Sequence, residues 1–372
     1  APSASRSSAG SPQVAGRRGP AASASANPTV EKAKLSLAAA SEAIEEEAPD
    51  PQAEARAAKQ RERLKAERET SILAGLDELD RWIGDILARG LAAFLKDAPG
   101  LCRIAAQRLV DAKAPALAAR IDAFPSQVLS LPLERRADAA IEALGAWHLL
   151  AEAYRRQDDL PAALRHDVRR LAGWSEQRQA LLDDPQALRL TADWTVMATF
   201  SDVQPDKLRR NETWLAGEDG RTALLLDFVP VATGASGPAF LAGERFCAEL
   251  VFYPSAEPLR ALLVSKSQAS ESAKPVALPD MSEALADFEA RRACQPWLGA
   301  IPIRFRAGIV RRALKGALWI TDGQTSLPLD PRMHDELIVL DGMALEAAAG
   351  FWDGQVFAPV SAETQIGTWG RI

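Results

Sequence analysis

Apolar residues recur every three or four positions over residues 72–95. They are Ile72, Leu76, Leu79, Ile83, Ile86 or Leu87, Leu91, and Phe94 or Leu95. This spacing lies along one side of an α-helix, so it predicts an amphipathic helix whose apolar face packs on a core. We expect a second amphipathic run after Gly100 and a third that begins at Pro115, because proline is tolerated in the first turn of a helix.

The helical pattern continues to about residue 173. Pro125 and Pro132 indicate a loop, and helical spacing returns over residues 134–156 and 160–173. Ahead of the apolar stripe, residues 52–69 are rich in Ala, Glu, Lys and Arg with little apolar face, which favours a solvated helical extension. We therefore predict an all-helical domain of about five or six helices.

After Leu190 the pattern changes to short runs rich in β-branched and aromatic residues, which are typical of strands. The runs cover residues 194–200, 209–215, 222–229, 245–253, 259–264, 302–310, 318–321, 336–340 and 355–360. Gly-Glu-Asp-Gly at 217–220 fits a hairpin loop, and Thr-Asp-Gly-Gln at 321–324 fits a second turn. Residues 281–294 return to helical spacing, which predicts one helix packed against the strands.

These patterns predict an α+β protein in which an N-terminal all-helical domain precedes a β-rich domain with one packed helix. We place the helical domain at residues 55–190 and the β-rich domain at residues 191–372, with a linker near 265–280. Residues 1–54 are an Ala/Ser/Pro-rich segment, and we expect a disordered tail there. So few large apolar side chains cannot offset the entropy that is lost on ordering.

Charge and cysteine content narrow the classes of function. The net charge of -6 gives no electrostatic reason to expect general phosphate binding. Three cysteines far apart in the sequence do not form a disulfide framework, so we expect reduced thiols and a cytoplasmic protein. The longest apolar runs are interrupted well before the roughly 20 residues that a membrane span needs, and we expect no membrane partner.

The motifs of common enzyme classes are missing. The sequence contains no Walker phosphate loop, no G-x-G-x-x-G, no H-E-x-x-H and no C-x-x-C. Residues 234–237 (GASG) fall short of the nucleophile elbow G-x-S-x-G. We therefore expect no catalytic or cofactor-binding residue, no small-molecule substrate and no enzymatic activity. An enzyme would need Asp, Glu and Arg side chains gathered from both domains in a deep pocket, which spacing cannot reveal.

The three histidines give few candidates for general bases or metal ligands. His148 and His166 lie on predicted helices with no cysteine nearby in sequence. His334 stands beside carboxylates, but adjacent residues on a strand or turn point apart. We interpret all three as satisfied or surface histidines and expect no metal site in this chain.

A basic cluster is the strongest candidate for an interaction surface. Its members are Arg304, Arg306, Arg311, Arg312 and Lys315, with Trp319 close behind them. On a strand, Arg304 and Arg306 share one face, which could meet an acidic partner or a phosphate. The alternative is a solvated outer face of the sheet, and buried core rings are the default for the many tryptophans of this half.

Several segments, taken in order, resemble bacterial SWIM zinc-finger family proteins over most of residues 70–370. The segments are 75–82 (GLDELDRW), 108–119 (RLVDAKAPALAA), 214–218 (WLAGE), 223–228 (ALLLDF), 249–254 (ELVFYP) and 258–261 (PLRA). The family's defining element, C-x-C followed by C-x-H, gives zinc four ligands and closes a structural site. This chain lacks that element, and the resemblance places the finger upstream of Ala1. Zinc is therefore implied only for that upstream finger, and no cofactor is expected in this chain.

The resemblance implies a binding or scaffolding protein. Family members are found near AAA+ ATPases and von Willebrand factor A proteins, which become the expected protein partners. Our leading hypothesis is therefore a cytoplasmic, non-enzymatic interaction protein. The alternative is nucleic-acid binding, through the upstream finger or through the region from Arg304 to Lys315.

Overall fold

A computed structural model describes residues 51–204, 207–233, 240–269, 277–314 and 316–370. The predicted tail up to residue 50, the centre of the predicted linker, the GASG segment and Lys315 lie outside the described residues. Contacts between Cα atoms divide the chain into Ala1–Leu64 and Lys65–Ile372. The domain bounds expected from the sequence stay a prediction.

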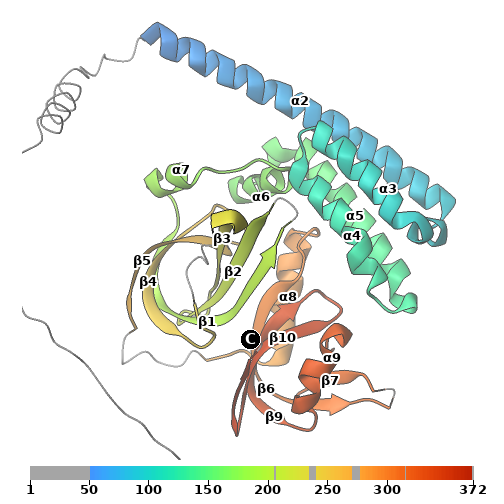
Figure 1. The fold of residues 1–372 in the computed structure, drawn as a ribbon, viewed down its shortest axis with the longest axis vertical. Coiled ribbons are helices and arrows are strands. Elements are labelled where there is room, and N and C mark those ends of the chain that lie inside the picture. Colours follow the sequence, from blue (N-terminus) through green and yellow to red (C-terminus); the bar gives the residue numbers. More distant parts are fainter. Residues whose placement is uncertain (1–50, 205–206, 234–239, 270–276, 315, 371–372) are drawn as a thin grey trace, which may run out of the picture. The chain divides into compact units, whose positions relative to one another are not determined.

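The helical region is built from six α-helices within the described residues (Figure 1). They are α2 (Pro51–Arg89), α3 (Leu91–Asp111), α4 (Pro115–Leu129), α5 (Arg136–Arg155), α6 (Ala162–Ala172) and α7 (Arg178–Asp183). Two short 3-10 helices, Leu133–Arg135 and Gln157–Asp159, lead into α5 and follow it. The helical half of the predicted fold class is thereby confirmed.

The predicted apolar stripe forms the side of α2 that faces the core. Ile72 is fully buried, and the later stripe residues of α2, down to Ile86, are at most 6% exposed. Beyond the stripe, four aromatic rings from α2, α3, α4 and α5 pack edge-on or stacked, with ring centroids 5.3 to 6.3 Å apart. They are Trp82, Phe94, Phe124 and Trp147. Burial of these side chains removes a large apolar area from water, which is the main force that holds the helices together.

Two helix boundaries differ from the prediction. The break after α2 falls at Gly90, whose φ of 91° is a left-handed conformation that glycine adopts at low cost, whereas Gly100 lies inside α3. The loop expected at Pro125 begins only at Ser130, because α4 continues through the proline. Pro125 and the neighbouring Phe124 and Val128 are buried, so core packing offsets the backbone hydrogen bond that the proline lacks.

Two glycines of α2 allow a test of the helix packing. A methyl group at Gly75 would lie 2.4 Å from Cβ of Ala112, whereas a methyl group at Gly84 would meet nothing within 4 Å. We expect Gly84→Ala to raise the free energy of unfolding by about 1 kcal/mol, since alanine favours the helix. Gly75→Ala should lower it by about 1–3 kcal/mol through overpacking. Urea unfolding followed by circular dichroism measures both, and equal effects would contradict the close approach at Gly75.

The first part of the β-rich region is a closed barrel of five strands in the order β1-β2-β3-β5-β4. The strands are β1 (Arg189–Val203), β2 (Leu208–Gly217), β3 (Thr222–Pro230), β4 (Arg245–Phe252) and β5 (Arg260–Gln268). The predicted hairpin at 217–220 joins β2 and β3, and Gly220 takes a left-handed φ of 84°. Trp194, Phe246 and Phe252 are buried in the barrel core, where the alternation of each strand points them.

The second part is a six-stranded sheet in the order β11-β10-β9-β6-β7-β8. Its strands are β6 (Ile301–Arg312), β7 (Leu318–Thr321), β8 (Ser326–Pro328), β9 (Ala344–Trp352), β10 (Phe357–Thr364) and β11 (Gly367–Gly370). The predicted helix is α8 (Met281–Cys294), and Asp280 and Glu283 form a capping box at its start. Met281 and Phe288 of α8 pack into the core on one face of the sheet, which confirms the packed helix of the predicted fold class.

The prediction of a strand at 336–340 was wrong. These residues belong to α9 (His334–Leu337) and to a 3-10 helix, Ile338–Leu340. Leu337 and Leu340 are buried while Ile338 and Val339 are exposed, so the apolar spacing is helical and not alternating. The β-branched residues Ile338 and Val339 favoured a strand in the prediction. Strand propensity does not take into account which side chains are buried in the core.

Strand β9 was missed because its sequence, ALEAAAGFW, is rich in alanine, which favours helices. It forms a central strand because β6 and β10 pair with it on both sides. Gly350 permits the closest approach, since a Cβ there would lie 2.4 Å from the carbonyl oxygen of Ala358. Tertiary pairing therefore overrides local propensity in this segment.

Several contacts join the helical region to the β-rich region, and two of them involve the buried residues Asp167 and Trp297. The carboxylate of Asp167 in α6 is fully buried and accepts hydrogen bonds from the Ser255 hydroxyl at 2.7 Å and the Ala256 backbone N–H at 2.8 Å. Trp297, which follows α8, is part of the buried core of the helices, and its carbonyl oxygen accepts from Arg120 at 3.4 Å. No helix in the described part of the chain is long and apolar enough to cross a membrane.

Candidate interaction site

Strand β6 presents arginines on the face of its sheet that points away from α8. Phe305 is buried in the core, so its neighbours Arg304 and Arg306 lie on the opposite face. Ala307 has a left-handed φ of 57°, and beyond it the core-facing positions change from odd to even, with Gly308 and Val310 buried. Arg311 therefore lies on the same outer face as Arg304 and Arg306.

The neighbouring strand completes this surface. Arg311 lies directly opposite Trp319 of β7, whose side chain is 37% exposed. Residues directly opposite each other in an antiparallel pair share one face, so the ring and the guanidinium are neighbours. We call the exposed set Arg306, Arg311 and Trp319 the arginine face.

Arg312 does not belong to this surface. It ends β6 on the core-facing side of the alternation, and its guanidinium pairs with the carboxylate of Asp341 at 2.9 Å. The structure thus brings together Arg304, Arg306, Arg311 and Trp319 of the predicted interaction residues and places Arg312 apart from them. The sequence could not show this, because the reversal at Ala307 depends on the backbone conformation of one residue.

The two arginines of the arginine face have no ion pair within 4 Å among the described residues. The pKa of the Asp280 carboxyl is held below its ordinary value, chiefly by the backbone N–H of Glu283, and Arg306 adds to this effect from nearby. Both guanidinium groups are exposed on the strand. Both guanidinium groups can therefore form an ion pair with an acidic group from outside the chain.

Arg304 differs from them because it is partly buried and borders two cavities, of about 410 and 600 Å³. Its Nη1 is covered and has no hydrogen-bond partner among the described residues. Burial lowers the pKa of this guanidinium below its ordinary value, and Glu363 acts in the opposite direction. A buried donor without an acceptor lowers the stability of the folded protein, so Arg304 is a candidate for a role other than stabilising the fold.

We call the larger cavity the Arg304 cavity. It lies between the outer side of the barrel and the outer face of the second sheet, and Ala216 and Ala349 pack with Met197 and Trp214 at one end of this contact. Its small-residue walls are Ala216, Ala242, Gly243, Ala347, Ala348, Ala349, Ala362 and Gly370. Thr195, Ser361, Thr368 and Glu363 add polar groups beside Arg304. Side chains that end at Cβ leave this space between the two β layers.

The smaller cavity is lined by charges that neutralise one another. Arg291 pairs with Glu257 at 3.0 Å and with Asp287 at 2.6 Å. Burial raises the pKa of the Glu257 carboxyl, and the charge of Arg291 opposes this rise. These pairs account for Glu257 and Asp287, and the third carboxylate, that of Glu283, accepts from the backbone N–H of Asp280 at 2.9 Å.

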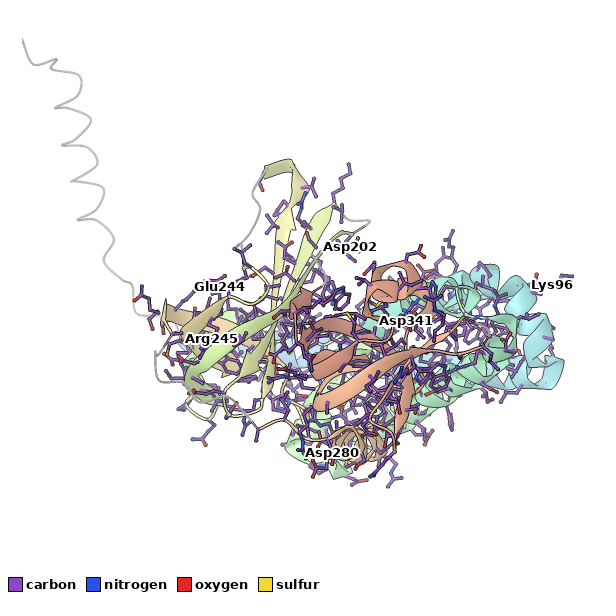
Figure 2. The ribbon with its side chains drawn as sticks, turned by 90° about the horizontal axis from the view of Figure 1, so that it is seen from below. Lys96, Asp202, Glu244, Arg245, Asp280 and Asp341 are labelled. Carbon is purple, nitrogen blue, oxygen red and sulfur yellow. The ribbon has the colours of Figure 1, made fainter. Side chains whose placement is uncertain are left out.

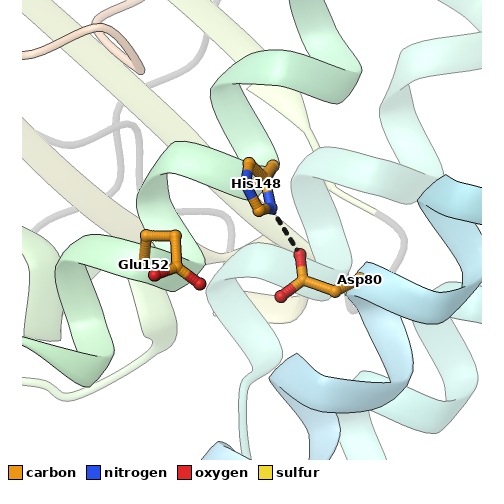
Figure 3. A group of neighbouring side chains, drawn as sticks. All are labelled: Asp80, His148 and Glu152. Atoms are coloured by element: carbon orange, nitrogen blue, oxygen red, sulfur yellow. Dashed lines mark hydrogen bonds and ion pairs between the residues drawn. The ribbon is translucent and has the colours of Figure 1, made fainter.

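Asp80, His148 and Glu152 form a separate cluster between α2 and α5 (Figure 3). The His148 ring nitrogen Nδ1 lies 2.8 Å from a carboxylate oxygen of Asp80. Arg155 pairs with Asp80 at 2.7 Å and also contacts Glu152. The carboxylates therefore already face a cation, and the cluster is accounted for as an ion-pair network.

The remaining predicted candidates are dispersed. His166 pairs with Glu176 at 2.7 Å, and His334 begins α9. Cys102 is buried in α3, where burial raises the pKa of its thiol to about 12, whereas Cys247 and Cys294 lie in β4 and α8. The sequence analysis did not single out the alanines of β9 and Glu363, which line the Arg304 cavity, and the run Ala347–Ala349 is the sequence signal for them.

The helical region matches a known family model. Residues 67–172 match the model of the SWIM-associated four-helix bundle domain. This match confirms the resemblance inferred from the sequence over the helical segment, and it ends at Ala172, the last residue of α6. No curated protein and no solved structure matches the chain. We call residues 67–172 the SWIM-associated bundle.

The burial of Arg304 gives a stability prediction. Arg304→Met removes a covered donor and keeps most of the side-chain volume, so we expect the free energy of unfolding to stay equal or rise by about 1 kcal/mol. Arg306→Met on the same face is the matched control and should change it by less than about 0.5 kcal/mol. Thermal and urea unfolding measure both. A clear loss of stability for Arg304→Met alone would mean that the guanidinium makes structural bonds.

The dispersed cysteines give a second prediction. With no C-x-C or C-x-H pair in the chain, we expect excess chelator to leave the circular dichroism spectrum and the melting temperature unchanged. Elemental analysis of the purified protein is the companion measurement. Stoichiometric zinc together with unfolding by chelator would show that our interpretation of the histidines and cysteines is wrong.

Proposed function

We propose that this chain is a non-enzymatic binding protein that docks an acidic surface of a partner protein on the arginine face. The observation that carries the proposal is the exposure of Arg306, Arg311 and Trp319 on one sheet face, with neither arginine in an ion pair among the described residues. Arginine and tryptophan are the residues most enriched among those that dominate binding energy at interfaces.

The chemistry of the face favours carboxylates. A guanidinium presents a planar fork of donors that matches a carboxylate with two parallel hydrogen bonds. Trp319 adds apolar area beside Arg311, which would exclude water from such a pair. The alternative for this surface is a solvated sheet face without a partner, in which case its charge would not affect binding.

The family resemblance supplies the partners to test. It implies AAA+ ATPases and von Willebrand factor A proteins, which we propose as the proteins that this chain binds. We also propose a cytoplasmic location, because the three cysteines are free.

Nucleic acid is the second candidate partner, and the same arginines favour it. Arg304, Arg306 and Arg311 follow one strand, as phosphate-binding side chains do. The net charge of -6 argues against it, because the protein as a whole repels a polyanion. Nucleic-acid binding would also fall steeply with salt, since each neutralised phosphate releases counterions.

The test is a binding titration with charge-reversed variants. We expect the wild-type chain to bind a purified AAA+ ATPase or von Willebrand factor A protein encoded beside it. Arg306→Glu/Arg311→Glu should weaken that binding by at least about tenfold, because two attractive contacts become repulsive. Lys96→Glu/Arg108→Glu is the charge-matched control on α3, where both residues are exposed and neither has an ion pair among the described residues. Figure 2 shows Lys96 far from Asp280, whose carboxyl lies near Arg306. The control should bind as the wild type does.

Two outcomes would overturn the proposal. One is equal weakening by both double variants, which would reveal a general effect of charge. The other is no binding to either protein class, together with a salt-sensitive shift of duplex DNA that the Arg306/Arg311 variant abolishes, which would establish the nucleic-acid alternative. Circular dichroism of each variant checks that the fold is retained.

A further inference from the structure

The Arg304 cavity is a second feature, and it is independent of the arginine face. Arg304 is partly buried between the barrel and the second sheet, whereas Arg306 and Arg311 are exposed on the surface. The register of the sheet aligns Arg304 with Ala349 of β9 and Ser361 of β10, which all line the cavity. The guanidinium thus stands at the end of a row of small side chains.

The walls indicate the size and polarity of what could enter. The cavity is about 600 Å³, which is within the range of small-molecule sites, and much of its lining is alanine and glycine. These short side chains accommodate a compact apolar body. The hydroxyls of Thr195, Ser361 and Thr368 offer additional hydrogen bonds.

The charged residues of the cavity indicate the charge of the ligand. Arg304 lines the cavity and forms no ion pair within the described part of the chain, and burial lowers the pKa of its guanidinium, so a carboxylate placed beside it would offset the lost hydration. Glu363 also lines the cavity and would repel a ligand that carries two negative charges. One carboxylate fits this balance better than a phosphate dianion, because it matches the guanidinium fork with a single charge.

We propose that the Arg304 cavity binds a small monocarboxylate with a short apolar body, whose carboxylate pairs with Arg304. The apolar part lies against Ala347 and Ala349, and the hydroxyl of Ser361 lies next to the carboxylate. This site does not rest on the proposed function, because none of the arginine face residues lines the cavity. The ligand is bound and is not transformed.

The test uses sodium butyrate as the probe and saturation-transfer difference NMR on the full chain. We expect saturable contact of the butyrate methyl group with the protein at a Kd of roughly a millimolar, the range for so small a ligand. Arg304→Met should weaken binding by at least about tenfold, while Arg306→Met, on the same strand face, should bind as the wild type does. Butanol, which has a similar apolar body without the charge, should bind at least about tenfold more weakly.

A second variant separates the cavity from the charge. Ala347→Leu fills part of the cavity and keeps Arg304, so it should also abolish butyrate binding, with an unchanged circular dichroism spectrum as the folding check. No saturation transfer to butyrate in the wild type would overturn the proposal. Equal transfer in Arg304→Met, or displacement of butyrate by equimolar sulfate, would overturn it as well. The Arg306→Glu/Arg311→Glu experiment measures binding of the partner protein and not of butyrate. The two proposals can therefore fail independently.

Discussion

The structure of this protein depends on the buried carboxylate of Asp167, which joins the SWIM-associated bundle to the barrel. An ionised carboxylate taken out of water is costly unless donors surround it. Here the Ser255 hydroxyl, the Ala256 backbone N–H and, at 3.1 Å, the guanidinium of Arg170 all donate to it. Because these donors come from both regions, the carboxylate is satisfied only when α6 and the loop after β4 lie together. Trp297 reinforces the joint by placing a ring from the β-rich region in the core of the helices.

The second sheet carries both candidate surfaces because of how β6 is built. Its core-facing positions hold the sheet against α8, which leaves the arginines on the other side. The barrel covers the part of this outer face that contains Ala349 and Phe351, through Met197 and Trp214. Arg304 lies beside the covered part and is partly buried, whereas Arg306 and Arg311 lie beyond it and are exposed. One strand thus supplies a partly buried cation and two exposed ones.

This division gives the two arginine environments different physical properties. The exposed guanidinium groups stay hydrated until a partner binds. They therefore contribute to the rate and specificity of partner binding more than to the stability of the fold. Arg304 has already lost part of its hydration and has an unsatisfied donor, so its cost is present in the folded protein at all times. Proteins retain such costs at binding sites, where a ligand recovers the lost interaction. The net negative charge of the chain makes a local cationic surface more selective, because distant anions are repelled while a well-placed carboxylate is held.

The sequence by itself determined the elements with strong periodicity. The stripe from Ile72 to Ile86, the helix Met281–Cys294 and the hairpin at 217–220 could be predicted, since helical spacing, a capping box and glycine turns are local properties. The segments at 75–82 and 108–119 also indicated the SWIM family, which the match over residues 67–172 confirms. Only the tertiary structure decided that ALEAAAGFW forms a central strand, that Arg311 rather than Arg312 lies on the same face as Arg306, and that Arg304 is partly buried. These features depend on neighbours distant in sequence and on a single backbone conformation, neither of which a local pattern encodes.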